Sequence, residues 1–173
     1  MKIVNLDGYT TNPGDLSWDW LGNYGEYKVY DRTAPEQIVE RAKGADILII
    51  NKSVITAQML ENLPNLKFVG LQSTGYNVID CKAARARNIT VSNIPAYSTT
   101  GVAQLVFAFI LQVADNVSLH SDAVHNGEWC ECPDFCFWKT PLTELDGKTI
   151  GIIGFGSIGR RVAQIANAFG MNV

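Results

Sequence analysis

Short apolar runs alternate with helical patterns through the first half of the chain, and this alternation constrains the fold more than any other feature. Short apolar runs bounded by turn residues indicate strands, while apolar residues spaced three and four apart indicate helices. The expected strands span residues 2–6, 26–30, 46–50, 66–71 and 89–94, and the expected helices span residues 33–45, 56–63 and 78–88. Strands that alternate with helices form parallel βαβ units with helices on both faces of the sheet. We therefore expect an α/β domain with a doubly wound parallel sheet at residues 1–98.

One of these helices carries signals at both of its ends. Thr33 and Glu36 have the spacing of a capping box, and Pro35 lies in the first turn. Gly44 follows the last turn, where a residue in the left-handed conformation commonly ends a helix. We expect the helix to begin after Thr33 and to end at Gly44.

The composition is that of a soluble globular protein, because 47% of the 173 residues are hydrophobic and 18% are charged. The net charge of -3, without a basic run, gives no reason to expect a nucleic-acid partner. The longest apolar run, Gly101–Ala114, contains two glutamines, and crossing a bilayer takes roughly 20 apolar residues. We therefore expect a buried helix and no membrane partner. Residues 1–9 resemble a strand rather than a secretion signal, so we expect a cytoplasmic protein.

Residues 99–173 are organised differently. The hydroxyl residues Ser98–Thr100 are placed to cap a long helix from about Gly101 to about His120. Residues 126–148 then form a long irregular connection that is rich in aromatic side chains. Loops of such length are usually functional, disordered or engaged with a partner, and the aromatic content argues against disorder. We expect this connection to contribute to a contact between subunits.

Three cysteines lie close together in this connection. Cys130, Cys132 and Cys136, together with His125, place four potential zinc ligands within twelve residues. Their spacing differs from the recurrent C-x2-C pairs of zinc sites, and aromatic residues crowd the same stretch. Reduced thiols in a packed loop are the favoured interpretation and zinc the alternative, so we predict no metal site.

A glycine-rich turn lies near residue 155. Gly154, Gly156 and Gly159 have G-x-G-x-x-G spacing, after the apolar residues 149–153 and before the helical pattern of residues 157–169. In a strand-turn-helix of this kind the first glycine permits the tight turn, the second lets the backbone approach a pyrophosphate, and the third lets the helix pack on its strand. The alternative is a glycine-rich turn that serves packing alone.

The amides of Ser157 and Ile158 lie at the start of the expected helix. Unpaired N–H groups and the positive end of the helix dipole favour phosphate at that position. We therefore predict that the turn binds a dinucleotide. The acidic residue that would bind the ribose is expected about 20 residues after the first glycine, and that position is not among these 173 residues. The sequence therefore does not distinguish NAD from NADP.

The whole chain resembles the N-terminal half of the D-isomer-specific 2-hydroxyacid dehydrogenases. The resemblance is carried, in order, by "NKSVIT", "LQSTGYNVID", "VSNIPAYSTTGVAQ" and "LTELDGKTIGIIGFGSIGRRVAQIANAFGMNV". Within that family, "YSTTGVAQ" is most similar to the glycerate dehydrogenase and hydroxypyruvate reductase branch. The resemblance implies a flavodoxin-like substrate domain at residues 1–98. Residues 99–173 are then a hinge helix, a dimerisation-type loop and the start of a Rossmann NAD-binding domain.

The resemblance also implies an activity and a set of binding residues. The activity is hydride transfer between a nicotinamide and the 2-carbon of a small D-2-hydroxy or 2-oxo acid, with NAD as the expected cofactor and NADP left open. Thr74 and Gly75, with Ser73 before them, match the turn whose amides hold the substrate carboxylate, and Thr74 also lies near the cofactor. Lys52 matches a basic residue that faces the substrate in some members, and Val102 a position beside the nicotinamide. The alternatives are a plain turn, a solvated lysine and a core valine.

The two histidines, His120 and His125, match no catalytic residue of that family. Its catalytic arginine, glutamate and histidine have no counterpart in these 173 residues, so we predict no catalytic residue here and expect an inactive part of a longer enzyme. An alternative is an NAD-responsive protein of the same fold, as in the corepressor members of the family. Self-association is also expected, through apolar side chains left exposed at Ile150, Ile152, Ile153, Val162 and Ile165.

Overall fold

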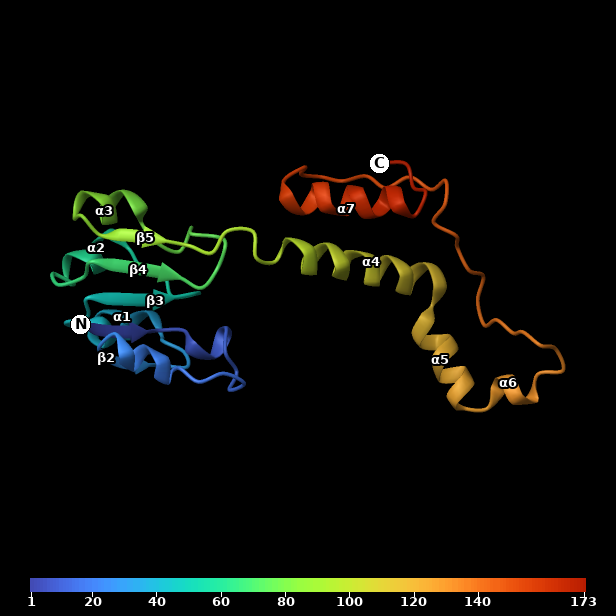
Figure 1. Ribbon diagram of the computed structural model, residues 1–173, viewed down its shortest axis with the longest axis horizontal. Helices are drawn as coiled ribbons and strands as arrows, with labels where there is room; N and C mark the ends of the chain where they lie inside the picture. The colour runs from blue at the N-terminus through green and yellow to red at the C-terminus, as the bar shows by residue number, and fades with distance from the viewer. The chain divides into compact units, whose positions relative to one another are not determined.

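The computed structural model describes all 173 residues, and they form two compact units, residues 1–95 and 96–173. The division falls close to the predicted boundary at residue 98. The first unit contains a five-stranded, fully parallel sheet in the order β2-β1-β3-β4-β5 (Figure 1). Its strands are β1 (Lys2–Asn5), β2 (Glu26–Val29), β3 (Ile47–Ile50), β4 (Phe68–Leu71) and β5 (Thr90–Ser92). The predicted α/β class and parallel sheet are confirmed.

The strand order reverses between β1 and β3. From β1 the chain moves outward to β2, and it then returns across β1 to build β3, β4 and β5 on the other side. In open parallel sheets such a switch point opens a crevice at the carboxyl ends of the strands, where ligands bind. The loops that follow β1 and β3 therefore meet at the position where a ligand site is expected.

The α-helices of this unit cover only one face of the sheet, which corrects the expectation of helices on both. They are α1 (Ile38–Ala42), α2 (Ala57–Glu61) and α3 (Cys81–Ala86). All three contribute to one core with the alternate strand residues that share this face. That core includes Val4, Leu6, Leu48, Ile50, Val69, Leu71, Ile38, Ala42, Leu60 and Ala84.

The opposite face is lined near β1 and β2 by residues 8–25, which form only the 3-10 turns η1 (Gly8–Thr10) and η2 (Asp19–Asn23). The turn η2 lies against Tyr27, whose hydroxyl donates to the Asp19 carboxylate at 2.7 Å. Tyr27 is in register with Ile3 of β1, one residue out of step with the helix-facing Val4. The connection from β1 to β2 thus lies on this face, but its four glycines and one proline disfavour an α-helix.

The predicted capping box at Thr33 does not form. The Thr33 hydroxyl instead donates to the carbonyl of Leu6 at 2.8 Å and accepts from Arg41. The segment consequently begins as a 3-10 turn, η3 (Pro35–Gln37), and Ala34 precedes it without a side-chain cap. At the far end Gly44 has φ +75°, the left-handed conformation expected after the last turn.

The second unit is largely helical. Its helices are α4 (Thr99–Asp115), α5 (Val117–His125), α6 (Glu128–Glu131) and α7 (Ser157–Ala168). The single long helix predicted from Gly101 to His120 is divided, because Asn116 adopts a left-handed conformation with φ 49°. The Ser98 hydroxyl does not cap α4, since the Ser98 backbone is itself helical. No single helix has the length and apolarity to span a membrane, although α4 and α5, bent by 62° at their junction, would do so as a pair by length and composition.

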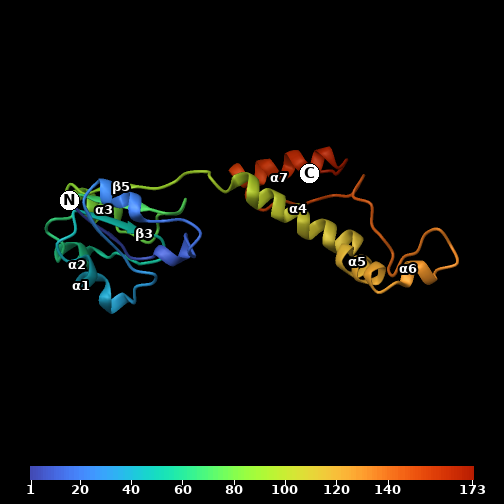
Figure 2. The ribbon, with the colours of Figure 1, turned by 60° about the horizontal axis from the view of Figure 1, so that its bottom comes forward.

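Helix α7 packs along α4, as both ribbon views show (Figures 1 and 2). Val162 and Ala166 of α7 meet Ala103 and Phe107 of α4, and the rings of Phe107 and Phe169 stack with their centroids 5.3 Å apart. Four of the five side chains expected to be exposed are therefore wholly or partly covered within the unit: Ile150, Ile152, Val162 and Ile165. That prediction is wrong for these four, whereas Ile153 is fully exposed.

The predicted strand before the glycine turn is reduced to one parallel bridge between Thr149 and Asn172. The amide of Ile150 donates to the carbonyl of Asn172 at 2.8 Å, and the amide of Asn172 donates to that of Lys148 at 2.7 Å. A strand needs a partner along its length to form a ladder, and only residues 171–173 lie beside it here.

Candidate functional site

The carboxyl edge of the sheet at the switch point is held by one buried carboxylate. Asp7, which follows β1, accepts hydrogen bonds from the amides of Asn51, Lys52 and Ser53, at 2.7, 2.9 and 2.9 Å. These three residues follow β3, so the bonds fix the start of the β3–α2 loop against the end of β1. The side chain of Lys52 lies exposed on this loop and makes no ion pair. Its ammonium is available to an anion.

The predicted substrate turn follows β4, the neighbour of β3. Its side chains are occupied: the Ser73 hydroxyl donates to the carbonyl of Gly75 at 2.8 Å, and the Thr74 hydroxyl donates to that of Ile94 at 3.0 Å. The amides of Thr74 and Gly75 donate to no acceptor in the protein. Both residues are exposed. The side chains thus stabilise the turn, as the plain-turn interpretation requires, while the backbone offers two N–H groups to an anion.

Asn93, just after β5, ties this turn to the next strand. Its side-chain amide donates to the carbonyl of Thr74 at 2.7 Å, and the amide of Ile94 donates to the carbonyl of Ser73 at 3.0 Å. Neither Asn93 nor Asp7 was predicted to be a site residue. A signal was available, because each is a polar residue directly at the carboxyl end of a parallel strand, where binding residues gather.

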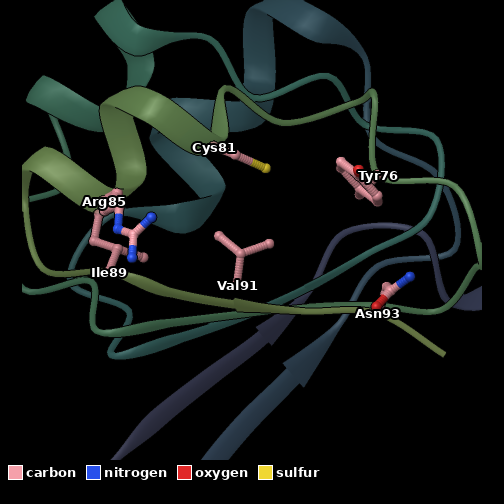
Figure 3. A pocket seen from close by; sticks show the side chains of 6 residues that line it. All are labelled: Tyr76, Cys81, Arg85, Ile89, Val91 and Asn93. Carbon is pink, nitrogen blue, oxygen red and sulfur yellow. The ribbon is translucent and has the colours of Figure 1, made fainter. Parts of the chain in front are cut away.

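Asn93 also borders a pocket of about 350 Å³ between α3 and β5. Figure 3 shows the side chains of Cys81 and Arg85 on α3 above Val91 of β5, with Tyr76 and Asn93 at the other end. The Arg85 guanidinium makes no ion pair. The pocket therefore adjoins the Ser73–Gly75 turn and shares Asn93 with it.

The glycine turn of the second unit has the geometry that its three glycines were expected to serve. Gly154 has φ +96°, which side chains rarely adopt. A Cβ on Gly159 would lie 2.2 Å from the carbonyl oxygen of Gly154, so only glycine lets α7 start this close to the turn. A Cβ on Gly156 would meet nothing within 4 Å. The space above Gly156 is open, as the approach of a pyrophosphate requires.

Helix α7 begins at Ser157, directly after this open position. Gly156 is its N-cap and has no side chain, so no capping group competes for the first amides, including those of Ser157 and Ile158. Both residues are exposed. The residues present therefore fit the diphosphate of a dinucleotide. Val102 lies exposed in the first turns of α4 within the same unit.

The two histidines are hydrogen-bonded to backbone groups of the second unit. Nδ1 of His120 lies 3.0 Å from the carbonyl of Asn116, and the amide of Lys139 donates to its Nε2 at 3.1 Å. The carbonyl can only accept, so the neutral ring carries its proton on Nδ1. His125 contacts the carbonyl of Ser121 at 2.8 Å through its own Nδ1. The cysteines are unbridged, and no cluster of three or more metal-ligating side chains forms anywhere in the chain.

The parallel sheet carries polar residues and free amides at the carboxyl ends of its strands, and the second unit carries a glycine turn of the dinucleotide-binding type. Together they define a class of α/β proteins that combine a doubly wound domain with a dinucleotide-binding turn. The chain belongs to the D-isomer specific 2-hydroxyacid dehydrogenase family, whose catalytic-domain model matches residues 10–168. It is 48% identical to a hydroxypyruvate reductase of Blautia hydrogenotrophica over 176 aligned residues, which cover 100% of this chain and 55% of the relative. It is 39% identical to a glycerate dehydrogenase of Methylorubrum extorquens, over 86% of this chain and 48% of the relative.

Solved structures agree with this assignment. An acyclic imino acid reductase in complex with NADPH and D-Arg superposes with a TM-score of 0.76 at 33% identity, covering 100% of this chain and 55% of that one. The TT0316 protein of Thermus thermophilus gives a TM-score of 0.77 at 27% identity, over 99% and 54% of the two chains. The chain thus spans about half the length of the curated relatives and solved structures it matches.

Proposed function

We propose that the whole protein is an NAD(P)-dependent oxidoreductase of D-2-hydroxy acids, acting on glycerate or hydroxypyruvate. The observation that carries the proposal is the glycine turn, where Gly154 has a left-handed backbone, Gly159 has no room for a side chain, and the position above Gly156 is open. The substrate class rests on the similarity to a hydroxypyruvate reductase and a glycerate dehydrogenase.

In this proposal the residues of the chain bind and orient the dinucleotide and the substrate. Gly154, Gly156 and Gly159 with the amides of Ser157 and Ile158 hold the diphosphate, at a helix terminus that favours negative charge. Val102 contacts the nicotinamide. When bound, the nicotinamide dinucleotide supplies or accepts the hydride that changes the oxidation state of the substrate 2-carbon.

The first unit binds the substrate carboxylate. The exposed amides of Thr74 and Gly75 donate to it, Ser73 and Thr74 fix the turn, and Lys52 adds a positive charge at the end of the neighbouring strand β3. Charge-assisted bonds of this kind are about twice as strong as bonds between neutral groups. A small 2-oxo acid, which consists mainly of its carboxylate and carbonyl, depends on such contacts for its orientation.

The polarising arginine and the acid-base histidine with its glutamate are proposed to come from residues outside these 173. The support is that the chain spans about half the length of its relatives and that His120 and His125 are engaged in local hydrogen bonds. We also propose a homodimer. The apolar side chains at the surface of the second unit support it, among them Phe109, Val113, Phe135 and Trp138.

The test is an assay of the full-length protein with hydroxypyruvate, following the oxidation of NADH and of NADPH in parallel. We expect turnover with NADH as the preferred cofactor, and we expect Lys52→Ala to raise the KM for hydroxypyruvate. The solved imino acid reductase contains NADPH, so the comparison of the two cofactors is needed. Tight binding of NADH without turnover of any 2-oxo acid would instead support an NAD-responsive binding protein of the same fold. Absence of both binding and turnover would refute the proposal.

A further inference from the structure

Asp7 is the centre of a hydrogen-bond cluster at the carboxyl ends of β1 and β3. Its side chain is buried, with 4% of its surface exposed. One carboxylate oxygen, Oδ2, accepts from three successive amides, those of Asn51, Lys52 and Ser53. The other, Oδ1, accepts from the Ser53 hydroxyl at 3.0 Å. Four donors from one loop therefore converge on a single residue that lies 44 to 46 positions earlier in the chain.

An ionised carboxylate suits this position better than any other side chain. Three amides that point at one place need an acceptor with several lone pairs and no proton of its own, and a negative charge strengthens each bond. Asp7 is itself fixed, because its amide donates to Oδ1 of the buried Asn5 at 3.0 Å. A second tie joins the same loops, since Asn51 donates to the Thr10 hydroxyl and that hydroxyl donates to the carbonyl of Asp7.

The backbone amide and the side-chain ammonium of Lys52 have different environments. The amide of Lys52 is held by Asp7 at 2.9 Å, whereas its ammonium makes no ion pair and its side chain is exposed. Both carboxylate oxygens of Asp7 already accept from amides and a hydroxyl, and neither forms an ion pair with that ammonium. The position of Lys52 is thus fixed at the carboxyl edge of the sheet while its cation stays available.

We propose that Asp7 is the positioning residue for Lys52: it holds the β3–α2 loop so that the ammonium meets the carboxylate of a small 2-oxo acid. The inference rests on the proposed function and deepens it. Asp7 acts through the loop and does not touch the substrate.

The experiment compares Asp7→Ala and Asp7→Asn in the full-length protein, with KM values for hydroxypyruvate and NADH measured separately. Alanine removes every acceptor, and we expect the KM for hydroxypyruvate to rise roughly tenfold or more. Asparagine keeps one oxygen for the amides, and its NH2 group can donate to the Ser53 hydroxyl, so we expect it to restore most of the affinity. The KM for NADH should not change in either variant. A rise in both KM values, or an alanine variant with the affinity of the wild type, would overturn the inference.

Asp46→Asn is the matched control, because Asp46 also joins β1, β3 and β4 but lies at their amino ends. It should leave the KM for hydroxypyruvate unchanged. Should Asp7→Ala fail to fold, Asp7→Asn is combined with Lys52→Ala. If Asp7 acts through Lys52, the small rise in KM that Asp7→Asn leaves disappears in the Lys52→Ala background, and amide exchange at residues 51–53 is faster in Asp7→Asn than in the wild type. Additive effects with unchanged exchange would overturn the inference while leaving the proposed function intact. A wild-type protein without turnover would overturn the proposed function itself.

Discussion

Asp46 is the residue whose ionisation is most clearly coupled to the sheet. The ammonium of Lys67, 2.8 Å from its carboxylate, holds the pKa of Asp46 below its ordinary value of 3.8, and the amide of Lys2 acts in the same direction. The bonds join the start of β3 to the residues that lead into β4 and begin β1. Protonation of this one group therefore weakens contacts to two neighbouring strands.

The sign of the pH dependence follows from this lowered pKa. A carboxyl group whose pKa is lower in the folded state stabilises the fold above its unfolded pKa, and the contribution is lost as the pH falls through the folded value. We expect Asp46→Asn to lower the urea midpoint slightly at pH 7, because Lys67 is largely exposed and a surface ion pair is weak. The difference from the wild type should shrink as the pH is lowered from about 5 towards 3.

Urea unfolding of wild type and variant at several pH values measures this difference. Lys67→Met is the companion variant, since it removes the ion pair and retains the carboxylate and its bond to the amide of Lys2. A midpoint difference between wild type and Asp46→Asn that grows on acidification would contradict the assignment.

At this scale a local pattern can identify a contact only where the partner is near in the chain, as at two helix caps that had not been predicted. The Thr56 hydroxyl accepts from the amide of Met59, and the Asp80 carboxylate accepts from that of Ala83, as caps before helical segments do. Thr33 shows the limit, because its hydroxyl found an acceptor 27 residues away and the local pattern had no information on it. The position of Asp7 after a strand was a signal for a site residue, but its donors lie 44 to 46 residues away and could not be read from the local pattern.

The elements themselves were largely predictable. All five strands of the first unit lie inside the predicted ranges, because short apolar or alternating runs bounded by turn residues mark them in the sequence. The break at Asn116 was missed, since apolar spacing continues from α4 into α5 and only the left-handed backbone of one residue separates them. The turn predicted to bind the substrate follows β4, but the roles of its groups were not predicted: the hydroxyls of Ser73 and Thr74 hold the turn, and the amides of Thr74 and Gly75 have no acceptor in the protein.

The strand-turn-helix at residues 149–168 permits a test that separates folding from binding. Gly159→Ala places a Cβ 2.2 Å from the carbonyl oxygen of Gly154, so backbone has to move. We expect a lower melting temperature and NADH binding weakened roughly tenfold or more. Gly156→Ala meets nothing within 4 Å, so we expect an unchanged melting temperature and a similar loss of NADH affinity, because the methyl group occupies the space of the diphosphate.

Calorimetric titration with NADH and thermal unfolding of the same samples measure the two effects. Gly22→Ala is the control for the substitution itself. Gly22 lies in the first unit, far from the glycine turn in the sequence, and its Cβ would make an ordinary 3.5 Å contact with Tyr27 of the same unit. It should change neither quantity by much. If Gly156→Ala binds NADH as tightly as the wild type, the turn serves packing and not the dinucleotide.

At the scale of the whole molecule, part of the apolar surface of the second unit is left uncovered. Val113 is 79% exposed, Phe135 91% and Trp138 69%. Val113 also lines an apolar groove of about 410 Å³ together with Phe109 and Leu145. The packing of α7 on α4 has already covered the surface for which a partner was first expected. The exposed apolar side chains that remain belong to α4 and to the aromatic connection, and large exposed apolar surfaces mark interfaces.

We expect the full-length protein to be a dimer with two-fold symmetry, in which this surface meets its own copy. Val113→Asp should shift the protein to monomer, because a carboxylate in the groove would have to be buried without a partner, and sedimentation velocity at several concentrations measures the change. Leu16→Asp is the control, since Leu16 is 69% exposed in the first unit and lies outside the surface. It should leave the dimer intact. A wild type that sediments as a monomer at every concentration would refute the dimer, and a dimer unaffected by Val113→Asp would place the interface elsewhere.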